Sequence, residues 1–171
     1  MRCIMQRMLH YLLDGTLVTI RPIEPEDKRL LVEGLRRLSP EAAFKRFLSP
    51  KVRFSDAELE YLTEVDGHDH IAYVAVRGDT LVAVGRVVKT APDTADIAIL
   101  VWDEWQGLGL GSWLARRLAD AAAAEGVTRI AGTMLADNRP ALRVMKGVST
   151  DFVHDELSHG VREIVTRLAA A

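Results

Sequence analysis

The segment Gln106-Gly107-Leu108-Gly109-Leu110-Gly111-Ser112 decides the fold of this chain. It separates an apolar, strand-like run from an amphipathic, helix-like run. Glycines have no side chains, so their N–H groups can approach an anion closely, and the helix that begins after them adds its aligned dipole. The segment therefore predicts a phosphate-binding turn, with an ordinary strand-to-helix turn as the alternative.

Two widespread phosphate loops do not fit this segment. A Walker loop needs Lys and then Ser or Thr after its last glycine, whereas Gly111 is followed directly by Ser112. A G-x-G-x-x-G dinucleotide loop would place its final glycine on Ser112 or Leu114. The spacing argues against an NTPase and against a nucleotide-dependent oxidoreductase. An oxidoreductase remains a less favoured hypothesis, beside the two that are given at the end of this section. Tight NAD binding without coenzyme A binding would favour it.

The amino-acid composition excludes several further classes of protein. The chain has 171 residues, enough for one domain with a real core. Lys and Arg total 22 against 24 for Asp and Glu, so we expect neither a nucleic-acid partner nor a membrane partner. Cys3 is the only cysteine, which excludes a disulfide framework and a cysteine metal cluster and fits the cytoplasm. We expect no metal, and a homodimer is compatible with the sequence.

Periodicity and turn residues predict an α+β order of elements. Residues 1–16 are predicted to be an N-terminal extension, and residues 17–171 a single domain. Helices are expected from Pro25, Ser39 and Ser55, after the glycine segment, and from Asn138. Strands are expected over 17–20, 71–77, 80–88, 95–101, 129–135, 150–157 and 161–168. The second half contains strand–helix crossovers.

The pattern Gln106-x-x-Gly109-x-Gly111 resembles the pyrophosphate loop of the GNAT acyltransferases. With the order of elements, the resemblance covers roughly residues 18–168. It implies a GNAT fold, which is a mixed, mostly antiparallel central sheet of six to seven strands flanked by helices. Residues 13–27, 37–41, 46–50, 55–59 and 63–66 are also similar to the GNAT domain of bacterial Pat-type protein lysine acetyltransferases.

The resemblance implies acetyl-CoA as the acyl donor. Its pantetheine arm would pair with the backbone of Leu100, Val101 and Trp102, because extended backbone offers amides and carbonyls at the required repeat. Asn138 matches an asparagine that contacts this arm, although it equally fits a helix N-cap, and both roles can coexist. The diphosphate would lie on the glycine segment, formed by Gln106, Gly107, Leu108, Gly109, Leu110, Gly111 and Ser112.

Asp96 is the candidate catalytic residue. Acyl transfer needs a neutral amine, so a base must remove its proton, directly or through water. Similar sequences carry a glutamate ten residues before the loop glutamine, and Asp96 stands ten before Gln106. Partial burial on this apolar strand would raise its pKa, whereas the alternative is a solvated residue at a strand end. Residues 143–146 contain no tyrosine to act as a general acid, so none is assigned.

These observations favour an N-acyltransferase that moves an acetyl group directly from acetyl-CoA to a primary amine. The Pat resemblance points to a protein lysine, and a small-molecule amine is the other acceptor. The aspartate in place of glutamate and the missing tyrosine motivate an alternative, a catalytically weak CoA-binding regulatory domain. His68 and His70 flank Asp69, but without a third ligand at a telling spacing they indicate a polar loop rather than a metal site.

Overall fold

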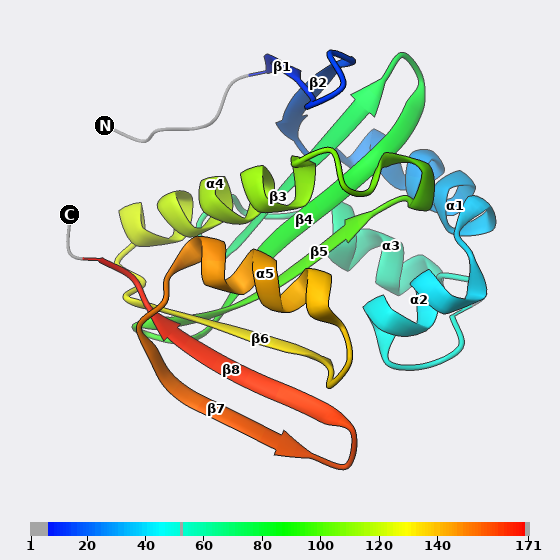
Figure 1. The fold of residues 1–171 in the computed structure, drawn as a ribbon. Coiled ribbons are helices and arrows are strands. Elements are labelled where there is room, and N and C mark those ends of the chain that lie inside the picture. The colour runs from blue at the N-terminus through cyan, green and yellow to red at the C-terminus, as the bar shows by residue number, and fades with distance from the viewer. Residues whose placement is uncertain (1–6, 52, 170–171) are drawn as a thin grey trace.

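The computed structural model describes residues 7–51 and 53–169, and this part of the chain is built on one mixed sheet (Figure 1). The helices are α1 (Lys28–Arg37), α2 (Pro40–Phe47), α3 (Asp56–Thr63), α4 (Leu110–Ala124) and α5 (Arg139–Val148). The strands are β1 (Met8–Tyr11), β2 (Leu17–Pro22), β3 (His70–Arg77), β4 (Thr80–Ala91), β5 (Thr94–Val101), β6 (Arg129–Leu135), β7 (Phe152–Ser158) and β8 (Val161–Arg167). One-turn 3-10 helices at Pro25–Asp27 and Asp103–Trp105 complete the elements.

The sheet has the order β1-β2-β3-β4-β5-β6-β8-β7, and only β5 and β6 run parallel. The predicted α+β class and mostly antiparallel sheet are confirmed, but the sheet has eight strands where six to seven were predicted. The missed strand, β1, pairs with β2 within the segment predicted to be an extension. It has only four residues, half-buried and exposed in alternation, so no apolar run marked it.

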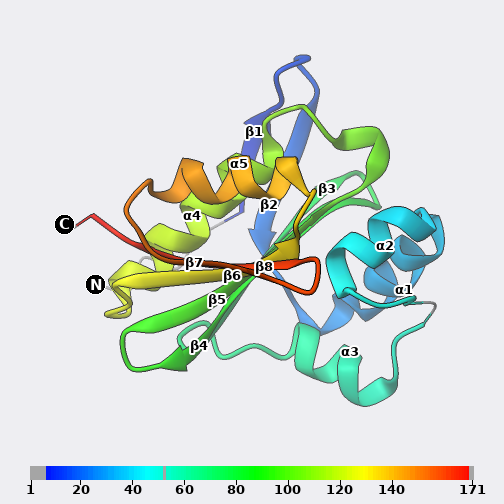
Figure 2. The ribbon, with the colours of Figure 1, turned by 60° about the horizontal axis from the view of Figure 1, so that its bottom comes forward.

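Helices cover both faces of the sheet (Figures 1 and 2). Helices α4 and α5 lie on one face, over a core that includes the fully buried Leu114, Leu118 and Ile130. Helices α1, α2 and α3 lie on the other face, over a second core that contains Leu31 and Trp102. Among the described residues, no helix covers β8 and β7 on the face away from α5, and most of β7 is exposed.

The helix starts follow from local capping chemistry. The side chain of Ser39 accepts from the amide of Ala42, and Ser55 and Glu58 form a reciprocal capping box at α3. Asn138 accepts from the amide of Ala141 at the start of α5. Polar residues of these types before apolar periodic runs are the reason the helix starts could be predicted from the sequence.

The feature that positions the site is a divergence of two neighbouring strands. Strands β5 and β6 pair only over Thr94–Asp96 and Arg129–Ala131, and their remaining residues separate. The glycine segment follows the far end of β5 and leads into α4. The sheet therefore carries a V-shaped gap with the glycine segment at its wide end. Within the described residues, no helix is both long and apolar enough to cross a bilayer.

Candidate active site

The gap between β5 and β6 is lined by the backbone of alternate β5 residues. The amide of Trp102 donates to the carbonyl of Val82, so this position faces β4. The direction of the backbone N–H and C=O groups alternates from one residue to the next along a strand. The backbone groups of Leu100 therefore also point toward β4. The backbone groups of Ile97, Ile99 and Val101 consequently point away from β4, toward the gap, and the Val101 carbonyl there accepts from the Gln106 side chain.

This alternation bears on the three residues predicted to contact the pantetheine arm. Trp102 has no polar group left, because its carbonyl accepts from Trp105 and its indole N–H donates to Gly34 at 2.7 Å. Leu100 uses its backbone toward β4. Of the three predicted residues only Val101 faces the gap. Ile97 and Ile99, which were not among the predicted residues, share this direction with Val101, because backbone direction has a period of two along a strand.

The glycine segment forms a turn whose backbone has the features that an anion-binding site needs. Gly107 and Gly109 have φ angles of 76° and 86°, which favour glycine. Gly109 is the N-cap of α4 and offers no side-chain cap, so the helix amides of Leu110, Gly111 and Ser112 begin without an acceptor. These donors and the helix dipole suit a phosphate group.

Neighbouring groups hold the turn in place. The Gln106 side chain donates to the carbonyl of Val101 at 3.0 Å, which ties the loop to the end of β5. The amide of Leu13, in the β1–β2 turn, donates to the carbonyl of Leu108 at 3.2 Å. A β-carbon at Gly111 would lie within 4 Å of Val101 and Val144. The loop, the end of β5 and the middle of α5 therefore converge at the gap.

Asn138 lies at the start of α5, after the end of β6. Its side-chain oxygen accepts from the amide of Ala141 at 3.2 Å, which confirms the N-cap interpretation. The capping bond uses the oxygen only, so the amide nitrogen remains a donor for a second partner. The cap role and the predicted contact with a pantetheine arm are compatible.

Asp96 lies where β5 and β6 separate, opposite Val88 on β4 and Ala131 on β6. It is exposed and faces the side of the sheet that α1, α2 and α3 cover, together with Leu100. Partial loss of water contact raises the pKa of Asp96, and the negative charge of Glu163 on β8 raises it further. A carboxylate with a raised pKa at the closed end of the gap suits a general base.

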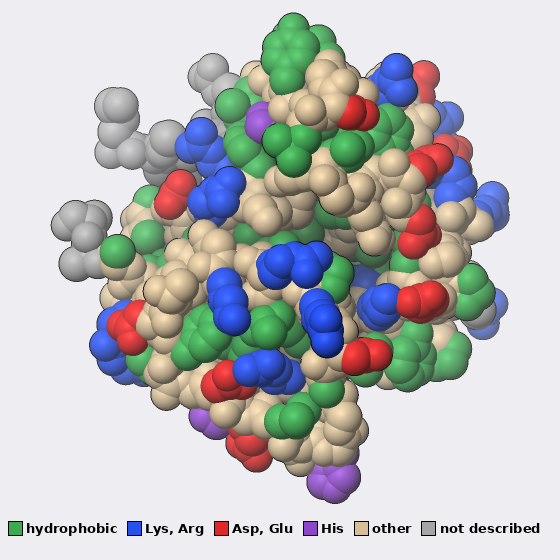
Figure 3. All heavy atoms as spheres, in the orientation of Figure 1, with side chains coloured by type: hydrophobic (Ala, Val, Ile, Leu, Met, Phe, Trp, Pro, Cys, Tyr) green, Lys and Arg blue, Asp and Glu red, His purple; other side chains and the backbone are tan. Residues whose placement is uncertain are grey.

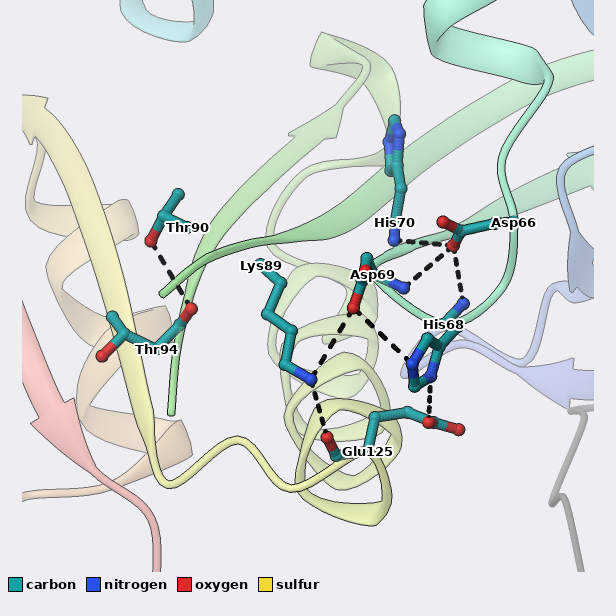
Figure 4. A network of polar contacts seen from close by, with 8 residues as sticks. All are labelled: Asp66, His68, Asp69, His70, Lys89, Thr90, Thr94 and Glu125. Carbon is teal, nitrogen blue, oxygen red and sulfur yellow. Dashed lines mark hydrogen bonds and ion pairs between the residues drawn. The ribbon is translucent and has the colours of Figure 1, made fainter. Parts of the chain in front are cut away.

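His68 and His70 belong to a structural network rather than to a metal site (Figure 4). The carboxylate of Asp66 accepts from the amides of His68, Asp69 and His70 at 2.8–2.9 Å. The His68 ring pairs with Glu125 at the end of α4. No group of three metal-binding side chains lies together among residues 7–51 and 53–169. His68 therefore lies in a polar loop as predicted, whereas His70 is the buried first residue of β3.

The surface beside the gap is basic. Figure 3 shows Lys and Arg side chains gathered over α5, next to a hollow that separates it from the helices of the other face. Helix α5 carries the exposed Arg139, Arg143 and Lys146. Arg116 on α4 approaches Gly147, where an added β-carbon would lie 3.8 Å from its guanidinium. These cations give the surface of α4 and α5 beside the gap a positive charge.

Comparison with known proteins fixes the family. Residues 34–148 match the acetyltransferase (GNAT) family. The matched residues include both strands of the gap, the glycine segment and α5. The chain belongs to the GNAT acetyltransferase family. The described part of this GNAT chain superposes on the crystal structure of the GNAT domain of Streptomyces "S. lividans PAT" with a TM-score of 0.83 and 28% identity, covering 95% of this chain and 97% of that one.

Two curated relatives agree with this assignment. The chain is 32% identical over 149 residues to acetyltransferase Pat of Mycolicibacterium smegmatis, covering 85% of this GNAT chain but only 44% of that protein. It is 31% identical to acetyltransferase PA5475 of Pseudomonas aeruginosa, covering 74% of this chain and 70% of that protein. A more distant structure, yncA of Salmonella typhimurium with its cofactor acetyl-CoA, shares the fold with a TM-score of 0.72 at 15% identity.

Proposed function

We propose that this GNAT chain is an acetyl-CoA-dependent N-acetyltransferase that acts on a primary amine by direct transfer. The observation that carries the proposal is the gap between β5 and β6, which ends at an uncapped helix start. A pantetheine arm could pair with Ile99 and Val101 as an added strand would, with its diphosphate on the amides of residues 110–112. The basic residues of α5 would balance the remaining phosphate charge.

Asp96 would remove the proton that makes the amine unreactive. The amine nitrogen attacks the thioester carbonyl, the carbon–nitrogen bond forms, and the carbon–sulfur bond breaks. The amine proton passes to the Asp96 carboxylate, directly or through one water, because aspartate is one methylene shorter than glutamate. The second proton on the nitrogen passes through water to the leaving thiolate, which leaves as the thiol, since α5 contains no tyrosine to supply a proton.

The acceptor is a primary amine, and the similarity to Pat supports a protein lysine as one candidate. The chain spans less than half of the Mycolicibacterium protein, so the acceptor of that protein is only a guide. A small-molecule amine is the second candidate.

Calorimetric titration with acetyl-CoA, with NAD as the control, is the first test. We expect saturable binding of acetyl-CoA and none of NAD, because the turn lacks the dinucleotide spacing. Release of free thiol in the presence of an amine panel then tests turnover. Binding without turnover on any amine would support the regulatory alternative, and NAD binding without acetyl-CoA binding would overturn the proposal.

A further inference from the structure

A small cavity lies between the sheet and the three helices that cover the Asp96 face. Its volume is about 30 Å³, and it is lined mainly by apolar side chains of α1, α2, α3, β4 and β5. Two arginines, Arg46 from α2 and Arg86 from β4, also line it. Charged groups in apolar surroundings are costly unless they are paired, so this pair of cations requires an explanation.

Arg86 is the more buried of the two, with 5% of its surface exposed. Its guanidinium donates to the carbonyl of Leu62 at 3.1 Å and contacts the His70 Nε2 at 3.0 Å. Burial lowers the pKa of His70 to about 4, so its ring is neutral and can accept this bond. Both partners of Arg86 are therefore neutral, and its positive charge has no counter-ion.

Arg46 faces the same cavity from α2. Its guanidinium lies 5.1 Å from the centre of the Phe47 ring, which is its one described side-chain contact. Burial lowers the pKa of Arg46, and the charge of Arg46 is one of the causes that lower the pKa of Arg86. Among residues 7–51 and 53–169, no carboxylate forms an ion pair with either arginine. The two cations therefore repel each other across a cavity without a compensating anion.

The cavity adjoins the candidate base. Arg86 is the direct cross-strand partner of Ala98, and Asp96 is the next residue of β5 on the same face. Diagonal neighbours of this kind have β-carbons about 7–8 Å apart. Helix α2, which carries Arg46, contacts both β5 and β6 beside the gap. An acceptor with its amine at Asp96 can therefore extend toward the two arginines.

We propose that Arg46 and Arg86 bind an oxyanion of the acceptor, so that the substrate is a small amine carrying a carboxylate or phosphate group. This inference rests on the proposed acetyl transfer and names its substrate class. Guanidinium groups pair with both oxyanions through two parallel hydrogen bonds. A cavity of about 30 Å³ has room for one such group but not for the whole acceptor, whose amine must lie outside it.

Matched amines test the proposal. We would measure kcat/KM with acetyl-CoA for 4-aminobutanoate against butylamine, and for 2-aminoethyl phosphate against ethanolamine, so that the two arms separate carboxylate from phosphate. Charge-assisted hydrogen bonds predict a preference of about 10- to 100-fold for one anionic amine over its neutral partner. Glycine and 6-aminohexanoate would define the spacing between amine and anion.

Arg46→Met should bring this preference close to one, because it removes a guanidinium and keeps an unbranched apolar side chain. Arg29→Met is the matched control, since Arg29 is exposed on α1 and pairs only with Glu33. It should retain the full preference. If Arg46→Met fails to fold in thermal unfolding, Arg86→Lys serves instead, because it keeps the charge but loses the planar fork.

Calorimetric titration of the anionic amines in the absence of acetyl-CoA separates this inference from the proposed function. Binding that Arg46→Met abolishes would support the anion site even if no transfer occurs. Equal kcat/KM for charged and neutral amines in the unaltered protein, or a preference for a blocked lysine peptide, would overturn the proposal. A preference that Arg46→Met leaves intact would overturn it as well.

Discussion

The two faces of the sheet bury different kinds of residues. Under α4 and α5 the core is apolar, and Leu114, Leu118 and Ile130 are fully buried there. Under α1, α2 and α3 the core surrounds ionisable groups, among them Arg86. Burying apolar surface stabilises the fold, whereas burying an arginine without a counter-ion opposes it. Burial on the first face therefore stabilises the fold. The buried arginine on the second face lowers the stability, at the place where we propose that the substrate is selected.

The largest effect should come from removing the base on the second face. Asp96→Asn keeps the size of the side chain but cannot take a proton, so we expect kcat to fall by about 10²- to 10⁴-fold. Acetyl-CoA affinity should be unchanged in calorimetric titration. Asp93→Asn, at the start of the same strand, is the control and should retain its rate. An Asp96→Asn protein with full activity would remove the difference drawn between the two faces.

On the first face the largest effect should be on stability. Leu118→Ala leaves a cavity at a fully buried position and should lower the free energy of unfolding by about 2–5 kcal/mol. Urea denaturation measures this change. Leu157→Ala, on the exposed strand β7, is the control and should cost less than about 0.5 kcal/mol, because 64% of that residue is already exposed. Equal losses would contradict the assignment of the core to this face.

The glycine segment lies where the two faces meet and should show a smaller effect. Gly109→Ala forces an L-residue to a φ of 86°, which should cost about 1–2 kcal/mol of stability and weaken acetyl-CoA binding. Gly78→Ala is strained in the same sense, at a φ of 58°, but lies in the β3–β4 turn. It should lose stability and keep its affinity for acetyl-CoA. Loss of affinity in both proteins would point to general unfolding.

The smallest effect concerns pH. The raised pKa of Asp96 places the acid limb of kcat/KM above the usual range of an aspartate, because only the carboxylate accepts the amine proton. Glu163→Gln removes one cause of the increase, so the limb should move to lower pH in a pH–rate profile. Glu156→Gln, opposite Glu163 on β7, is the control. An unmoved limb in Glu163→Gln would show that Asp96 does not set it.

The same shift predicts a change in stability with pH. Asp96 binds its proton more tightly in the folded protein than in the unfolded chain, so its contribution to stability is present below its unfolded pKa. That contribution is lost as the pH rises through the folded pKa. Asp96→Asn should therefore be more stable than the unaltered protein only above that pH, which denaturation at several pH values would reveal.

The sequence by itself determined the order of the predicted elements, the helix starts and the glycine turn before α4. These features depend on local chemistry: Ser39, Ser55 and Asn138 cap helices, and Gly107 and Gly109 adopt positive φ. Asp96 was proposed as the general base from its distance to the turn, and the structure places it at the closed end of the gap. Its role in catalysis stays a prediction.

Only the tertiary structure decided which groups meet. Strand β1 gains its place by pairing with β2, and the strand register directs Val101 into the gap while Trp102 bonds to its neighbours. Arg46 and Arg86 lie 40 residues apart in the chain, and no local pattern brings them to one cavity. Contacts between distant segments depend on how the helices pack on the sheet, and the spacing of residues along the chain does not predict that packing.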